Sequence, residues 1–159
     1  MNKLKAMKLI DDIFKDFKYI YTHKINLEIA AKHFTFSMGY LPEIQLTMHF
    51  RDKYLDVLAF PHPIIVNENN RNEIILTINY INNIIKSLGH FYVDDNNDIA
   101  YSLRLSYNLL EKLPKYCLEQ IETSIDFYCD ILKTLYRLSI GDLTYLESKE
   151  IINDIWLIN

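Results

Sequence analysis

The fold is decided by one short stretch of the sequence, Ile99-Ala100-Tyr101-Ser102-Leu103-Arg104-Leu105-Ser106-Tyr107. Its odd positions are large and apolar, whereas its even positions are small or polar. This period of two predicts a strand with one buried side and one polar side. A shorter run, Phe91-Tyr92-Val93, precedes it, and the acidic, asparagine-rich segment 94–98 between the two runs is typical of a hairpin turn.

Three further alternating runs lie upstream, at residues 34–38, 44–50 and 54–60. A break at residues 39–42 and a polar connection at residues 51–53 separate them, so we expect three antiparallel strands joined by short turns. The buried side of the third run stays open, because Leu55 and Val57 alternate with Leu58 and Phe60.

Between and beyond the strands the apolar spacing changes to three and four, which predicts helices. We expect helices at residues 4–24 and 73–88, with Gly89 as a left-handed residue after the second. A long third helix should begin at Pro114 and end at Gly141. Its apolar face predicts packing within the chain, with a dimer seam as the alternative.

A short last helix should span residues 144–156, because Thr144 and Glu147 match a capping box. Its apolar residues should dock on the domain or on a second subunit. The 159 residues therefore predict a single α+β domain (1–159) with a five-stranded antiparallel sheet. The element order is helix, three strands, helix, two strands, long helix and short helix. Each strand has one polar side, so the helices should pack mainly on one face of the sheet.

Composition restricts the classes of function. Half of the residues are hydrophobic, and 17 basic against 21 acidic residues give a net charge of −4, which argues against nucleic-acid binding. No apolar run is long enough to predict a membrane span or a signal peptide. Two cysteines, Cys117 and Cys129, fall in one predicted helix and cannot pair within it, which favours free thiols and a cytoplasmic location. The abundance of Ile, Asn, Lys and Tyr is typical of AT-rich bacterial genomes.

Several short motifs in residues 60–136 resemble those of a known family. They are Ala59-Phe60-Pro61, the Asn82-Asn83 pair, Gly89-His90-Phe91-Tyr92-Val93-Asp94, Ile99-Ala100-Tyr101 and the long helix that follows. In this order they resemble the YbjN family of bacterial sensory transduction regulators, whose fold is that of type III secretion chaperones. The resemblance implies a non-enzymatic, often dimeric, protein-binding or regulatory module. It implies no catalytic residue.

No motif for catalysis or for a cofactor is evident. The turn at Asp94-x-Asn96-x-Asp98 resembles the start of a calcium loop, but Ile99 and Leu105 stand where that loop needs glycine and a carboxylate. We therefore interpret it as a hairpin turn. The five histidines lack metal-ligand spacing, and the three glycines form no phosphate loop. We predict no catalytic residue, no metal and no cofactor.

One feature suggests recognition. The polar side of the predicted sheet carries mainly hydroxyl, amide, imidazole and guanidinium groups, on Thr35, Ser37, Gln45, Thr47, His49, Ser102, Arg104 and Ser106. This face either is a solvated scaffold or is a flat, hydrogen-bonded contact surface. As the candidate partner-binding face we take Thr47, His49, Ser102, Arg104 and Ser106.

Three functional hypotheses follow from the sequence. The first is a protein-binding or regulatory module that acts as a homodimer on a partner of unknown identity. The second is a small-ligand-binding protein or enzyme with a pocket between the first helix and the sheet, for which the candidate lining is Tyr19, Tyr21, Phe34, Phe36 and Tyr101. The third is an immunity or antitoxin-like inhibitor, to which a small acidic domain is suited.

Overall fold

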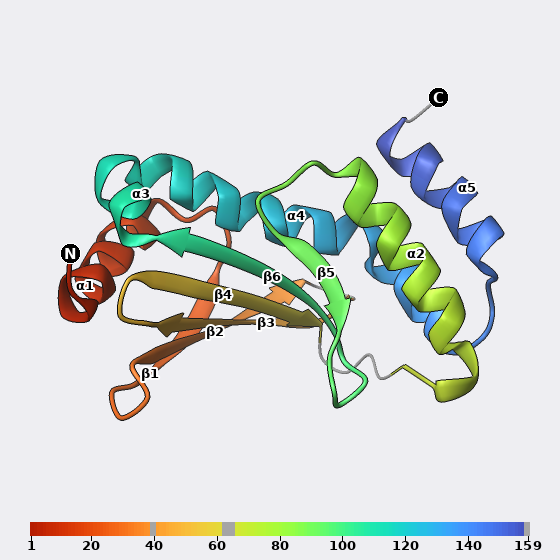
Figure 1. Cartoon of the computed structure of the whole chain (residues 1–159), viewed down its shortest axis with the longest axis horizontal. Coiled ribbons are helices and arrows are strands. Elements are labelled where there is room, and N and C mark those ends of the chain that lie inside the picture. The colour runs from red at the N-terminus through yellow and green to blue at the C-terminus, as the bar shows by residue number, and fades with distance from the viewer. Residues whose placement is uncertain (39–40, 62–65, 158–159) are drawn as a thin grey trace.

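A computed structural model of the chain shows an α+β arrangement with one antiparallel sheet (Figure 1). It describes residues 1–38, 41–61 and 66–157. Within them the sheet has six strands in the order β1-β2-β3-β4-β6-β5. Their bounds are β1 Tyr21–Asn26, β2 Ala31–Met38, β3 Leu41–Phe50, β4 Tyr54–Pro61, β5 His90–Val93 and β6 Ile99–Ser106.

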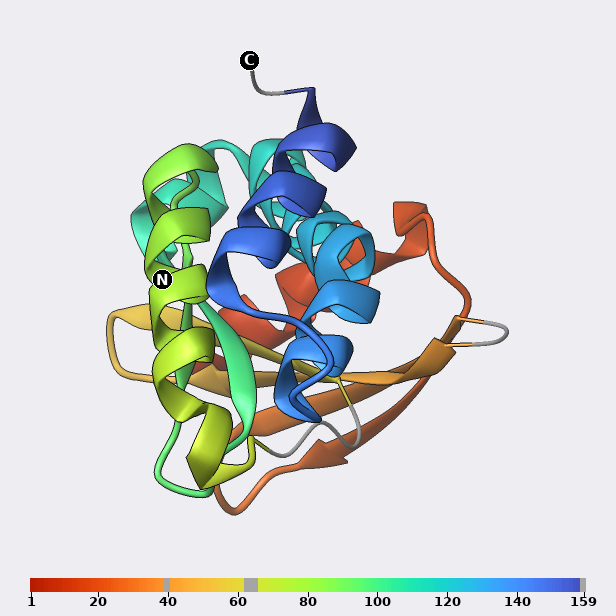
Figure 2. The same ribbon diagram turned by 90° about the vertical axis from the view of Figure 1, so that its right-hand side faces the viewer.

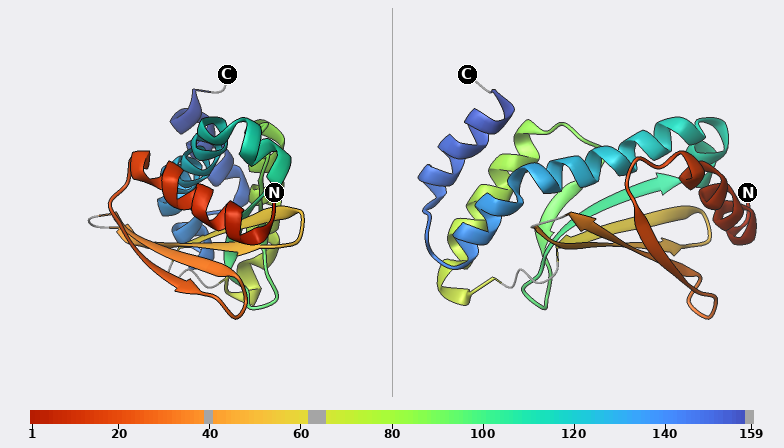
Figure 3. Two further views of the ribbon diagram at one scale, coloured as in Figure 1. Left: turned by 90° about the vertical axis from the view of Figure 1, so that its left-hand side faces the viewer. Right: turned by 180° about the vertical axis from the view of Figure 1, so that it is seen from behind.

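The five α-helices of the described ranges gather on one side of this sheet, as the views from the end and from behind show (Figures 2 and 3). The long helix α4 contacts the central strands β4 and β6, while α1 contacts β3 and α2 contacts β5. The prediction of helices mainly on one face is confirmed. The bounds are α1 Lys3–Ile13, α2 Arg71–Ile84, α3 Tyr107–Lys112, α4 Pro114–Ser139 and α5 Tyr145–Trp156, with short 3₁₀ turns at Phe14–Asp16 and Glu68–Asn70.

The strand register sorts side chains cleanly between the two faces. Phe34 of β2 pairs with Leu46 of β3, and Leu46 pairs with Ala59 of β4, so apolar positions align across strands. The same alignment continues into β6, where Val57 pairs with Leu103. All of these residues are at most 3% exposed beneath the helices. The open question about β4 is thereby answered, because Leu55, Val57 and Ala59 face the core.

The first predicted helix is wrong in its second half. After α1 and its 3₁₀ turn, the chain enters β1, which pairs with β2 and adds a sixth strand to the predicted five. Phe14, Phe17 and Tyr21 have helical spacing, but β-branched and aromatic residues also suit a strand, and β2 offers a free edge. Asn2 caps α1, since its side chain accepts a hydrogen bond from the Lys5 amide at 2.9 Å.

A buried lysine ties α1 to the sheet. The Lys32 side chain, 1% exposed on the covered face of β2, donates to the Met7 carbonyl oxygen at 3.1 Å and forms an ion pair with Asp11. Both acceptors belong to α1. A lysine ammonium can be buried at this position only because these two oxygens replace its water.

Two boundaries also differ from the predictions. The strand ends at Ser106, not Tyr107, because the Ser106 hydroxyl accepts from the Leu109 amide and caps α3. Helix α2 ends at Ile84, and Lys86, not Gly89, is left-handed at φ 43°. Glycine is needed at 89 for a different reason. A Cβ there would lie 2.5 Å from both the Ser102 carbonyl oxygen and the Tyr101 ring.

Other boundaries are confirmed. Helix α4 begins at Pro114, and Gly141 follows it with a φ of 80°. Thr144 forms the predicted capping box with Glu147 at the start of α5. Helix α5 docks on α2 and α4, because Ile152 is fully buried and the Trp156 indole donates to Asp130 at 2.9 Å. The predicted break at 39–42 falls partly on residues 39–40, which lie outside the described residues.

Very different losses of stability are expected from two adjacent substitutions in β6. Leu103→Asp buries an unpaired carboxylate beneath α4 and should lower the free energy of unfolding by about 3–5 kcal/mol. Arg104→Ser changes an exposed side chain and should lower it far less. Urea unfolding followed by circular dichroism measures both. Equal losses would mean that the faces of β6 are assigned wrongly.

Candidate functional site

The face of the sheet that points away from the helices is the candidate site, and we name it the open face. Within the described residues no helix packs on it. Paired positions form rows across all or most of the strands. One row is Lys24, His33, Thr47, Leu58, Ser102 and His90, and the next is Asn26, Ala31, His49, Asp56 and Arg104.

All five residues of the candidate partner-binding face lie on the open face, but they form two groups. Thr47 and His49 lie on β3, whereas Ser102, Arg104 and Ser106 lie on β6. Strand β4 separates the groups. The side chain of Ser37, also predicted for this face, lies outside the described part of the chain.

Each group has local hydrogen bonds of its own. The Thr47 hydroxyl lies 3.1 Å from His33 Nδ1 across the strand pair. Ser106 is occupied as the cap of α3, so its hydroxyl is committed to a structural role. Thr47, His49 and Ser102 are half-buried, and Arg104 is exposed.

The strongest polar cluster on the open face is centred on Asp56 of β4. Its carboxylate accepts from Arg104 Nε at 2.8 Å and from Arg51 Nε at 3.2 Å. The Asp56 side chain is only 15% exposed, whereas those of Arg51 and Arg104 are 54% and 64% exposed. The Arg104 guanidinium also lies over the Tyr54 ring, 4.2 Å from its centroid. We name Arg51 and Arg104 the arginine pair.

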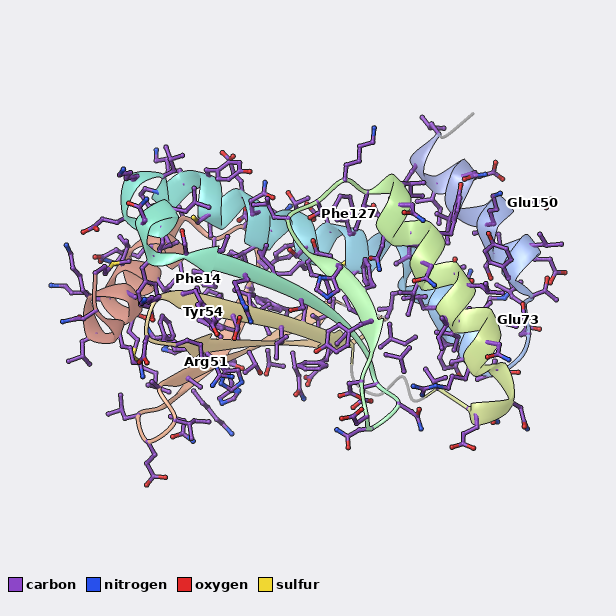
Figure 4. All side chains as sticks on the ribbon, viewed as in Figure 1. Phe14, Arg51, Tyr54, Glu73, Phe127 and Glu150 are labelled. Carbon is purple, nitrogen blue, oxygen red and sulfur yellow. The ribbon has the colours of Figure 1, made fainter. Side chains whose placement is uncertain are left out.

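The arginine pair lies at the end of the sheet nearest α1, where Figure 4 labels Arg51 and Tyr54. The β3–β4 turn is fixed there by Tyr107, whose hydroxyl donates to the Arg51 carbonyl oxygen at 2.6 Å. Burial of this hydroxyl raises the pKa of Tyr107 to about 12. Asp56 raises the pKa of Arg104, so that guanidinium stays charged at every ordinary pH.

Sequence reasoning missed three members of this cluster, Arg51, Tyr54 and Asp56. Arg51 was assigned to a turn, and the orientation of β4 was unresolved. A signal was present in the alternation of Tyr54, Asp56 and Leu58 with Leu55 and Val57. An aspartate in the middle of a strand is rarely buried, so Asp56 should point to the open face. Tyr54 and Leu58, which share its side of β4, should then point to the open face as well.

The comparisons with known proteins add no relationship. No model of a protein family matches the chain, and no curated protein shows significant similarity to it.

The five residues of the expected pocket between the first helix and the sheet do not gather in one place. Tyr21, Phe34 and Phe36 pack ring to ring with Phe14 and Phe17, with centroid distances of 4.5–6.3 Å. Tyr19 closes this cluster at 5.9 Å from Phe36.

Tyr101 lies elsewhere in the core, in a T-shaped contact with Phe91 at 4.8 Å. The aromatic residues proposed to line a pocket therefore pack in or against the core in the described structure. No arrangement among them suggests a ligand.

The acidic hairpin turn is stabilised by a carboxylate from within it. Asp94 Oδ1 accepts from the amides of Asn96 and Asp98 at 2.8 and 2.9 Å, which is an Asx-type turn, and Asn97 takes a φ of 64°. The interpretation as a hairpin turn is confirmed. Across the described ranges, no group of three or more potential ligand side chains could hold a metal ion.

The cysteines are free, and burial raises the pKa of both Cys117 and Cys129 to about 11. Both thiols therefore stay protonated at neutral pH and are poor nucleophiles. In the part of the chain that the structure describes, no helix has the length and apolar character needed to cross a membrane.

His49 should titrate below the ordinary value. Its pKa is lowered from 6.5 by burial first, and then by the charges of Arg51 and His33. Below about pH 6.5 the unfolded chain therefore binds more protons than the folded chain, and the free energy of unfolding should fall as pH falls through this range.

Ring resonances followed by NMR against pH measure this midpoint directly. A midpoint for His49 at or above 6.5 would contradict the burial of its ring on the open face. The His49→Asn variant provides the control, because it should lose that part of the pH dependence of unfolding.

Proposed function

We propose that the chain is a non-enzymatic protein-binding or regulatory module that acts as a homodimer. In this proposal the open face binds a segment of a partner protein. The observation that carries the proposal is the one-sided sheet, whose second face no described helix covers and whose side chains are largely polar and accessible. A resemblance to YbjN-type regulators and secretion chaperones predicts the same role.

The chemistry of the open face suits a wet contact better than a reaction. The hydroxyl and imidazole groups are spread over the rows and do not converge on one buried point, while the two guanidinium groups converge on Asp56 as ion pairs. Such groups form the direct and water-bridged hydrogen bonds that are common at protein interfaces. Leu58 lies half-buried between Thr47 and Ser102 and adds an apolar contact near the centre.

The homodimer is proposed at the other accessible part of the sheet, its β1 edge. Ile25 on this strand is 49% exposed, and the β1–β2 turn beside it carries Leu27 at 74% and Ile29 at 55%. An edge strand with exposed apolar side chains offers unpaired backbone groups to another strand. Pairing with the same edge of a second copy would cover these groups.

Photo-crosslinking at single positions tests both parts of the proposal. A benzophenone amino acid at Thr47 should crosslink to a partner protein in cells that make the chain. The same group at Ile25 should give a product of twice the 19.0 kDa mass of the chain. At Lys133, on the exposed side of α4, it should give neither product.

The crosslinked partner must then bind the unlabelled chain as a purified protein. Ser102→Lys, at the centre of the open face, should weaken this binding, while Glu119→Lys on α4 makes a comparable exchange for lysine elsewhere and should not. Equal effects of the two variants, or products from Lys133 alone, would rule out the open face as the binding surface.

A further inference from the structure

We infer that the arginine pair binds an acidic segment of the partner protein that carries at least two neighbouring carboxylates. This inference rests on the proposed function and names the chemistry of the partner. It is carried by the geometry of Arg51, Arg104, Asp56 and Tyr54, and by the hollow that adjoins them.

The arginine pair has unused donors in a defined orientation. Each guanidinium bonds to Asp56 through Nε, and none of the four Nη groups of the pair hydrogen-bonds to a described residue. Both side chains are more than half exposed, so these Nη groups are accessible. A guanidinium presents its N–H groups as a planar fork that matches the two oxygens of a carboxylate. Two such forks side by side match two carboxylates.

The pair is held in place before any ligand arrives. Asp56 is mostly buried and anchors one edge of both guanidinium groups, and the Tyr54 ring supports the plane of Arg104 at 4.2 Å. Long arginine side chains normally lose rotamer freedom on binding. Because this freedom is already restricted here, less entropy is lost when an anion binds.

A hollow of about 480 Å³ adjoins the pair and is lined by Lys3, Arg51, Asp52, Lys53 and Tyr54. Lys3 pairs with Asp52 at 3.0 Å, while Lys53 forms no ion pair with a described residue. With Arg104 and Asp56 included, four cationic side chains surround two carboxylates. The hollow therefore extends the positive region beyond the arginine pair and provides space for a chain to enter.

The local charge contrasts with that of the whole molecule, whose net charge is −4. A net negative chain repels anions at long range, so a surplus of cations confined to one end of the sheet favours a short acidic segment. A nucleic acid needs a longer basic footprint along its phosphates. The neighbouring row of the open face instead carries Thr47, Leu58 and Ser102, which suit a peptide.

Binding of a hexa-aspartate peptide to the full chain tests the inference. The side-chain Nε–H resonances of Arg51 and Arg104 should shift in NMR spectra, since these groups lie at the contact. Arg51→Gln and Arg104→Gln should each weaken binding about tenfold, as expected for the loss of a charge-assisted hydrogen bond. Arg104→Lys keeps the charge but loses the fork, and it should still weaken binding.

Lys24→Gln is the matched control, because it removes the same charge from the same face. Lys24 lies three strands from β4, about 14 Å away, which exceeds the screening length of about 8 Å at physiological salt. It should leave binding nearly unchanged. Melting curves establish that each variant is folded.

Three results would overturn the inference. They are no shift of the arginine resonances, equal weakening by Lys24→Gln, and tighter binding of a hexathymidylate than of the peptide. Failure of this inference can be distinguished from failure of the proposed function. If a crosslinked partner binds through the open face but tolerates Arg51→Gln and Arg104→Gln, only this inference fails. If the peptide binds at the pair but no partner crosslinks at Thr47, the protein-binding role fails instead.

Discussion

The structure depends on one constraint, the strict alternation of side chains across an antiparallel sheet that helices cover on one face only. Paired residues of neighbouring strands point to the same side of the sheet. The buried position of Leu46 therefore requires that Ala59 face the core, and that of Val57 requires the same of Leu103. A shift of one residue in any strand would turn buried side chains to water and polar ones into the core. The core beneath α4 and the polar open face are therefore two consequences of one register.

Much of this arrangement could be predicted from local periodicity. The β5–β6 hairpin, the covered side of β6, the start of α4 and the cap of α5 all depend on patterns within a few residues. The sixth strand, β1, could not be predicted in this way, because the apolar residues of 14–25 fit helical and extended spacing alike. Only the pairing with β2 decides between a helix and a strand. Gly89 was noticed for its backbone freedom, whereas its role is to let β6 approach closely.

For the open face, sequence patterns identified the surface but not the polar cluster around Asp56. Arg104 was identified as an isolated polar residue, and Asp56 and Arg51 join it only through the register of β3, β4 and β6. A mostly buried carboxylate needs charged partners, and here two guanidinium groups supply them while keeping their outer donors free. The need to neutralise Asp56 thus orients a surface that suits acidic ligands. A structural ion-pair cluster and a recognition element are the same residues in this account.

The central claim is that one face of the sheet is open and the other is sealed. Reaction of introduced single cysteines with a thiol reagent tests it most directly. The native Cys117 is buried and Cys129 is half-buried, and the raised pKa of both thiols makes them react slowly in the folded chain. Gln45→Cys and Leu46→Cys are neighbours on opposite faces of β3. The account predicts that the cysteine at 45 reacts at once in the native protein and that the one at 46 reacts only on unfolding. Equal protection of both positions would show that the face called open is covered, and would contradict the account.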